Sequence, residues 1–190
     1  PTRDMINAYE AGDVRKAISV QPGYTLNGVF RDIPYVSKYQ YAHTITGRTD
    51  NNWPVLRYAD VLLMLAESIN EASGPNAEAY DYLNQVRKRA GLAALDGLSK
   101  DAFRTAVLKE RRVEFALEGI NWFDIKRFYY RDPAAAVQYL NAMERETVYN
   151  RDTGPNAADE NTVEGYILTP PTSPITINAS HLWLPIPSAE

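Results

Sequence analysis

Two glutamates in a helical stretch are the side chains of this sequence best placed to do chemistry. Glu110 follows Phe103 by seven residues and falls on the apolar side of that stretch, and Glu114 lies next to it, one turn further along. An isolated carboxylate in an apolar interior is strongly unfavourable, so these acids must be paired or hydrogen-bonded. We therefore predict a structural ion-pair network. Its members are Arg57, Glu110, Arg111, Glu114 and Arg127, with Arg87, Arg89 and Arg112 as further candidate partners.

Catalytic and metal-binding chemistry fit this sequence poorly. It has no cysteine and only two histidines, His43 and His181, and it lacks the Gly-x-Ser-x-Gly motif of serine hydrolases. Carboxylate metal bundles need Glu-x-x-His pairs, and no predicted helix holds a histidine. A phosphate-binding glycine loop is also missing. We predict no catalytic residue, no metal and no cofactor. A glycoside-acting enzyme stays open as an alternative, because any two of the 24 acids could meet.

A long loop-rich stretch, residues 21–53, mixes aromatic and polar side chains. The C–H faces of sugar rings stack on aromatic rings, while sugar hydroxyls need amides, carboxylates or guanidinium groups nearby. This mixture is typical of a glycan-binding platform, although aromatic residues in loops also pack on their own domain. The ligand-binding residues that we predict are Tyr35, Tyr39, Tyr41, Arg48, Asp50, Asn52 and Trp53.

Charge and hydropathy narrow the class of protein. The net charge of −4, without any basic run, argues against a general nucleic-acid binder. The longest apolar run, residues 61–66, is too short to span a bilayer. The chain begins at Pro1 rather than Met, so we expect it to be processed or cut out of something longer. The absence of cysteine leaves the compartment undetermined.

The elements that must position these residues are helices. The longest helical pattern, residues 54–71, is expected to form the central helix of the fold. Ala59, Leu62, Leu63, Ala66 and Ile69 form one apolar stripe, and Val61 and Leu65 begin a second, so we expect neighbours on several sides. Asn76 and Ser99 mark the starts of later helices, and Gly91 marks an end. The predicted helices cover residues 54–71, 76–90, 100–118, 122–131 and 134–148.

The predicted fold class is all-α, with tetratricopeptide-like helix hairpins, a long N-terminal loop and an extended C-terminal tail. The first and third helices start about 45 residues apart, against ~34 in that repeat, so the hairpins are repeat-like rather than regular. We expect a single domain over residues 1–190. It would comprise a loop-rich segment (1–53), a helical core (54–149) and an extended tail (150–190) that docks on the helices.

Four segments in order resemble the SusD/RagB family of bacterial outer-membrane nutrient-binding lipoproteins, from about residue 1 to the C-terminus. They are WPVLRYADVLL (53–63), LNQVRKRAGL (83–92), KERRVEFA with EG and WFDIKR (109–127), and LPIP (184–187). The chain departs from the family at Ile120-Asn121, where members usually carry His-Arg or similar. It resembles only the C-terminal part of a member, and the lipidated N-terminal cysteine is missing.

The resemblance implies a cell-surface protein that binds a glycan, sometimes a peptide, and passes it to a SusC-like TonB-dependent transporter. It implies no catalysis, and membrane attachment only through a lipid anchor absent from this chain. The matching motifs belong to the helical scaffold, so no ligand-binding residue carries over from the family. The alternative non-catalytic function is a helical-repeat scaffold for protein–protein interaction without a small ligand.

Overall fold

The computed structural model describes residues 1–31, 34–40, 42, 44–45, 51–143, 148–151, 166–169 and 176–182. The chain divides into two compact units. The first unit is Pro1 with Met5–Asp124, and the second is Thr2–Asp4 with Ile125–Glu190. The expectation of a single domain stays a prediction.

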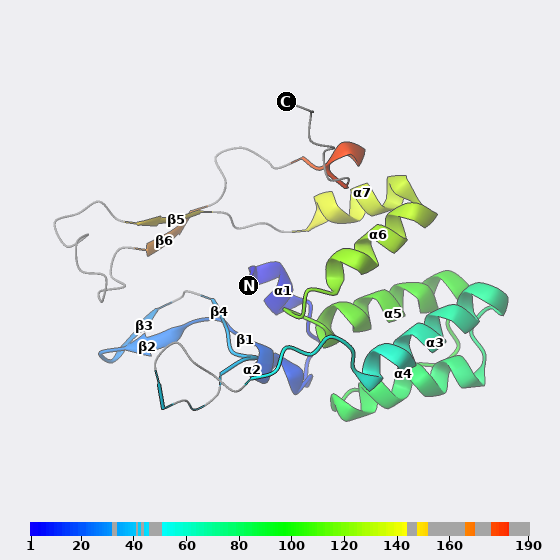
Figure 1. Cartoon of the computed structure of the whole chain (residues 1–190), viewed down its shortest axis with the longest axis horizontal. Helices are drawn as coiled ribbons and strands as arrows, with labels where there is room; N and C mark the ends of the chain where they lie inside the picture. Colours follow the sequence, from blue (N-terminus) through cyan, green and yellow to red (C-terminus); the bar gives the residue numbers. More distant parts are fainter. Residues whose placement is uncertain are drawn as a thin grey trace. The chain divides into compact units, whose positions relative to one another are not determined.

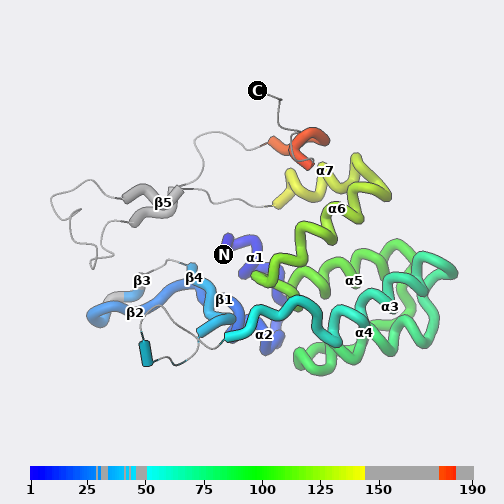
Figure 2. Tube along the Cα trace, viewed as in Figure 1, coloured from blue at the N-terminus to red at the C-terminus, as the bar shows by residue number. Residues whose placement is uncertain are grey.

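Three helices form the core of the first unit: α3 (Tyr58–Ser73), α4 (Ala77–Arg89) and α5 (Lys100–Glu114). Figures 1 and 2 show the three lying side by side, and α3 packs against both α4 and α5. Short connections join them as helix hairpins, which confirms the predicted all-α class. The apolar side chains between them are buried; they include Leu62, Leu63, Ala66, Leu83, Val86, Phe103 and Val107. The second stripe of α3 is less covered, since Leu65 is exposed.

Capping residues set the ends of α4 and the start of α5 as predicted. The Asn76 side chain accepts a hydrogen bond from the Ala79 amide at 2.9 Å, and the Ser99 hydroxyl accepts one from the Ala102 amide at 3.3 Å. Gly91 follows α4 with φ +77°, the left-handed conformation in which glycine is least strained.

In the first unit, the predicted start of α3 and the predicted end of α5 were wrong, and both errors have tertiary causes. Helix α3 begins at Tyr58 rather than at Pro54, because Arg57 is extended and its guanidinium hydrogen-bonds Glu114 and Glu118. Helix α5 ends at Glu114 rather than at Glu118, because Leu117 adopts φ +68°, which does not continue a helix. Side chains from elsewhere in the chain hydrogen-bond the carbonyls of this turn, as described below.

The N-terminal part of the first unit contains short helices and strands. The helices are α2 (Arg15–Ser19) and the last three residues of α1 (Arg3–Asn7), whose first two residues belong to the second unit. The strands form two antiparallel pairs, β1 (Val20–Gln21) with β4 (Tyr35–Val36) and β2 (Tyr24–Leu26) with β3 (Val29–Arg31). Asn27 and Gly28 both have positive φ in the β2–β3 turn, which is typical of a tight hairpin. Val20 is buried with Val113 and Ala116, which ties this segment to the end of α5.

The second unit contains most of α6 (Asn121–Arg131), α7 (Pro133–Ala142) and a hairpin of β5 (Val148–Arg151) with β6 (Tyr166–Thr169). The prediction that the fifth helix runs to residue 148 was wrong. A 3-10 helix, η2 (Ala179–Leu182), follows, and Leu182 is buried with Ile125 and Leu140. The tail therefore packs on helices at Leu182, while residues 183–190 lie outside the described part. No helix among the described residues has the length and apolar character to cross a bilayer.

Candidate functional site

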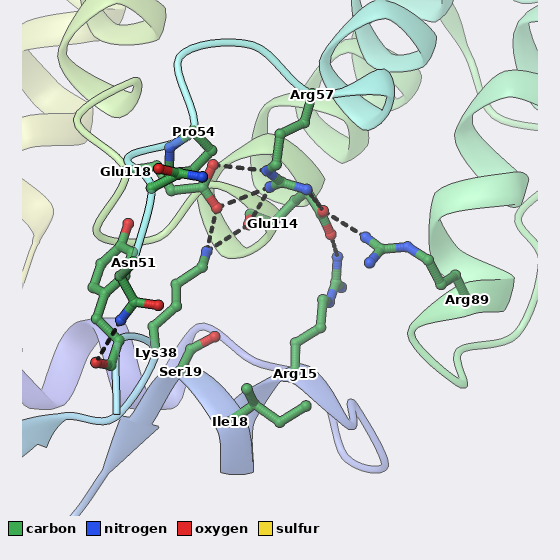
Figure 3. Close-up of a pocket in the computed structure, with 12 residues that line it drawn as sticks. Arg15, Ile18, Ser19, Lys38, Asn51, Pro54, Arg57, Arg89, Glu114 and Glu118 are labelled. Atoms are coloured by element: carbon green, nitrogen blue, oxygen red, sulfur yellow. Dashed lines mark hydrogen bonds and ion pairs between the residues drawn. The ribbon is translucent and has the colours of Figure 1, made fainter. Parts of the chain in front are cut away.

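A pocket of about 360 Å³ opens in the first unit, beside the C-terminal ends of α4 and α5 (Figure 3). Its walls come from α2, the loop after β4, the segment before α3, and the turn that follows α5. Four lining residues are cations and two are acids. The lining residues are Arg15, Ile18, Ser19, Lys38, Tyr39, Asn51, Asn52, Pro54, Arg57, Arg89, Glu114 and Glu118.

Three arginines converge on the carboxylate of Glu114. Arg57 Nη1 donates to its Oε1 at 2.8 Å and Arg15 Nη1 to its Oε2 at 2.9 Å, while Arg89 Nη2 also donates to Oε1. Figure 3 shows these guanidinium groups pointing toward the carboxylate from separate segments. Burial would raise the pKa of Glu114, but the hydrogen bonds from Arg57 and Arg15 outweigh it and lower the pKa. Glu114 is therefore held ionised.

Glu118 is the second acid of the pocket, and it lies in the turn after α5. Arg57 donates two hydrogen bonds to its carboxylate, from Nε to Oε2 and from Nη2 to Oε1, and both are 2.9 Å long. Lys38 Nζ pairs with the same carboxylate at 2.5 Å. Lys38 Nζ also donates to the carbonyls of Glu114 at 3.1 Å and Ala116 at 3.0 Å, which satisfies the broken end of α5.

Behind the pocket, Glu110 is buried between Arg15 and a further arginine, Arg87. Its carboxylate lies 2.7 Å from Arg15 Nη1 and 3.0 Å from Arg87 Nη1. Arg15 also pairs with Asp13 at 2.7 Å, and Arg87 with Glu10 at 3.0 Å. Each of these arginines thus neutralises more than one acid, and this part of the network joins α2, α4 and α5.

Arg111 forms a separate buried group on another side of α5. Its Nη1 donates to Asp60 Oδ1 at 2.6 Å and its Nε to Asp124 Oδ1 at 3.0 Å. Its guanidinium also lies 5.1 Å from the centre of the Phe115 ring, a cation–π contact. All four residues are buried. These contacts join α3, α5 and the start of α6.

The structure brings four of the five predicted network residues to α5 or its immediate contacts: Arg57, Glu110, Arg111 and Glu114. The fifth, Arg127, is exposed on α6 in the second unit. The sequence reasoning missed Arg15 and Lys38, for which no local signal exists. It also missed Glu118 as a member, although the four-residue spacing from Glu114 could have found it.

The predicted ligand-binding residues divide into three groups. Tyr39 and Asn52 line the pocket, and Trp53 adjoins it, 58% exposed and stacked on Tyr39 at 5.5 Å between ring centres. Tyr35 instead packs edge-on against Tyr24, at 6.2 Å. Tyr41, Arg48 and Asp50 lie outside the described residues.

The geometry of the pocket suits hydrogen bonding and stacking rather than proton transfer. A general acid near neutral pH needs a raised pKa, whereas the pKa of Glu114 is lowered. The described residues hold no group of three or more histidine, cysteine, aspartate or glutamate side chains arranged to bind a metal ion. Tyr39 is fixed by a hydrogen bond from its hydroxyl to the Leu117 carbonyl at 3.1 Å, so the ring stacked on Trp53 is held in place.

Comparisons with known proteins identify the family of this chain. A sequence profile of the SusD family matches residues 4–190. The chain is 31% identical over 153 residues to "SusD-like protein P2" of Formosa agariphila, covering 67% of this chain and 30% of that protein.

Two solved structures are also similar. A SusD superfamily protein from Parabacteroides distasonis matches with a TM-score of 0.56 and 35% identity, over 67% of this chain and 31% of that one. Surface glycan-binding protein A from Bacteroides uniformis matches with a TM-score of 0.55 and 27% identity, over 70% of this chain and 30% of that one. The chain thus spans about a third of the length of these relatives. Together with the profile match, they confirm that this chain belongs to the SusD family.

Proposed function

We propose that this chain is part of a cell-surface glycan-binding protein that serves an outer-membrane TonB-dependent uptake system and performs no catalysis. Membership of the SusD family supports this proposal, and so does the similarity to a protein named as a surface glycan-binding protein. The partner would be a SusC-like transporter, and attachment to the outer membrane would be through a lipid anchor.

The observation that carries the proposal is the stacked pair of Tyr39 and Trp53 beside the polar pocket. Trp53 is 58% exposed, so its indole offers apolar surface to a sugar ring. The neighbouring Asn51 and Asn52 line the pocket, where amides can exchange hydrogen bonds with sugar hydroxyls. Stacking and hydrogen bonding thus meet within one short segment.

The first test is calorimetry of the 190-residue chain with a panel of soluble oligosaccharides, comparing Trp53→Ala with the unmodified protein. We expect the variant to bind about tenfold more weakly, which corresponds to about 1.4 kcal/mol. Phe30→Ala is the matched control, because Phe30 is equally exposed at 58% but lies on the β2–β3 hairpin. Unchanged binding by Trp53→Ala would remove Trp53 from the site, and equal losses in both variants would point to a general effect.

A second candidate function, a protein-interaction scaffold without a glycan ligand, is favoured by one observation. Val55 and Leu56, which precede α3, and Tyr58, its first residue, are all exposed. Neighbouring exposed apolar side chains of this kind are typical of protein-binding surfaces. Capture of a transporter barrel in the absence of glycan, abolished by Leu56→Ser but not by Trp53→Ala, would support the scaffold. Release of reducing sugar from the oligosaccharide panel would instead support the glycoside-acting enzyme.

A further inference from the structure

We infer that the pocket beside Trp53 selects glycans that carry negative charge, through a carboxylate or sulfate group bound at Arg89. This inference rests on the proposed function, because it names the class of glycan that the same site takes. It is carried by the exposure, the hydrogen-bond partners and the charge of the side chains in the pocket.

The charged surface that a ligand meets in this pocket is cationic. The side chains of Glu114 and Glu118 are only 2% and 1% exposed, because arginines and a lysine cover them. The covering cations face solvent to a greater extent, with Arg89 57%, Arg57 28% and Lys38 18% exposed. The pocket therefore presents positive charge on a chain whose net charge is −4.

Hydrogen-bond capacity singles out Arg89 among these cations. Lys38 has three N–H donors, and its partners are the Glu118 carboxylate and two carbonyls of the turn after α5. Arg57 directs all three of its nitrogens to Glu114 and Glu118. Arg89, within the described part of the chain, makes a single hydrogen bond, from Nη2 to Glu114. Its remaining donors are available to a ligand.

A guanidinium with free donors matches the chemistry of charged sugars. Its planar fork can hold two oxygens of a carboxylate or sulfate in parallel hydrogen bonds, and such charge-assisted bonds are stronger than those to a neutral hydroxyl. Lys38 and Arg57, whose donors are largely used, would add attraction through their charge alone. The pocket volume of about 360 Å³ is near the lower end of ligand sites, about 300–1,000 Å³. One charged sugar would enter, and the next could stack on Trp53.

The test is calorimetry with three oligosaccharides of matched length: a neutral xylo-oligosaccharide, an oligogalacturonate and a sulfated carrageenan oligosaccharide. We expect at least tenfold tighter binding of one or both charged ligands, with an affinity that falls as salt rises from 50 to 300 mM. Preference for the uronate or for the sulfated sugar would identify which anionic group the site takes.

The variant Arg89→Gln isolates the proposed anion contact. It should weaken binding of the charged ligand at least tenfold, and the affinity that remains should depend less steeply on salt concentration. Lys88→Gln is the matched control, because it removes one exposed cation from the same turn of α4 outside the pocket lining, and it should change affinity less than twofold. Thermal melts of both variants check that the fold is intact.

The possible failures are distinguishable. Equal binding of neutral and charged ligands, lost in Trp53→Ala but unaffected by Arg89→Gln, would overturn the anionic selectivity and leave the glycan-binding function standing. Equal effects of Arg89→Gln and Lys88→Gln would also overturn it, because net charge rather than the pocket would then be responsible. Absence of binding to any oligosaccharide, including those of the wider panel, would overturn both.

Discussion

Two groups of ion pairs share α5, and they differ in how they meet solvent. In the closed group, Arg111 lies between Asp60 and Asp124, and every member is buried. In the open group, Glu114 is equally buried, but its partners Arg57 and Arg89 have side chains 28% and 57% exposed. The acids are shielded in both groups, and only the open group turns cations toward a pocket.

The difference shows that burial of the carboxylates does not decide whether an ion pair is available for binding. A fully buried group holds helices together, and any ligand would have to displace its protein partners at a large desolvation penalty. A group whose cations reach the surface can keep the same acids neutralised and still offer hydrogen-bond donors. The closed group therefore serves architecture, whereas the open group serves architecture and also exposes the cations on which the proposed anion site depends.

The largest effect is expected in the closed group. Arg111→Met should lower the free energy of unfolding by roughly 4 kcal/mol, because it removes the guanidinium that pairs with two buried carboxylates, Asp60 and Asp124. Urea denaturation monitored by tryptophan fluorescence measures this loss. A change below about 1 kcal/mol would show that both acids are hydrated, which would erase the distinction between the groups.

The next effect concerns the acid that lies behind the pocket. Glu110→Ala should cost roughly 3 kcal/mol, less than the arginine variant, because Arg15 and Arg87 keep other carboxylate partners. The exposed Asp81→Ala on α4 serves as control and should stay within about 0.5 kcal/mol. A loss under about half a kcal/mol for Glu110→Ala would mean that this residue is solvated.

A smaller effect is expected at Glu10, on the exposed edge of the network. A hydrogen bond from Arg87 lowers the pKa of Glu10 from 4.5 to about 2. Because its pKa is lower in the folded state, Glu10 stabilises the fold above about pH 4.5, and this contribution is lost as the pH falls toward 2. Its side chain is 36% exposed, so we expect a contribution below about 1 kcal/mol.

Urea titrations of Glu10→Gln from pH 5 to pH 2 check this. The variant should show a shallower loss of stability than the unmodified chain, and identical slopes would place the acid sensitivity elsewhere, for example at Glu114.

The smallest stability effect is expected in the open group, and it sharpens the contrast with Arg111. Arg89→Met should change the free energy of unfolding by less than about 0.5 kcal/mol, because its guanidinium is largely exposed and Glu114 keeps Arg15 and Arg57. Differential scanning calorimetry provides the measurement. A loss comparable to that of Arg111→Met would make the exposed arginine architectural and remove the basis for assigning it to a ligand.

Local sequence signals predicted the parts of the fold that depend on local energetics. Asn76, Ser99 and Gly91 set helix ends through hydrogen bonds and dihedral preferences within a few residues, and all three were identified correctly. The end of α5 was not, because Leu117 adopts a left-handed conformation that its type disfavours. That turn depends on Lys38 and Tyr39, which hydrogen-bond its carbonyls from 76 to 78 residues away.

Only some residues of the candidate site could likewise be predicted from local sequence. Spacing along one helix was enough to find Glu110 and Glu114 as acids on an apolar face, and composition was enough to indicate an aromatic segment around Trp53. Nothing near Arg15 indicates that it contacts Glu114, 99 residues away, because that contact exists only once α2 has packed on α5.

The amino-acid order thus determined the helices, most of their caps and the acids that need partners, since these follow from periodicity and from the penalty of burying charge. The tertiary structure alone decided which cations pair with these acids, where α5 ends and where the pocket forms. These features depend on contacts between distant segments, and on which guanidinium groups remain exposed after those segments have packed.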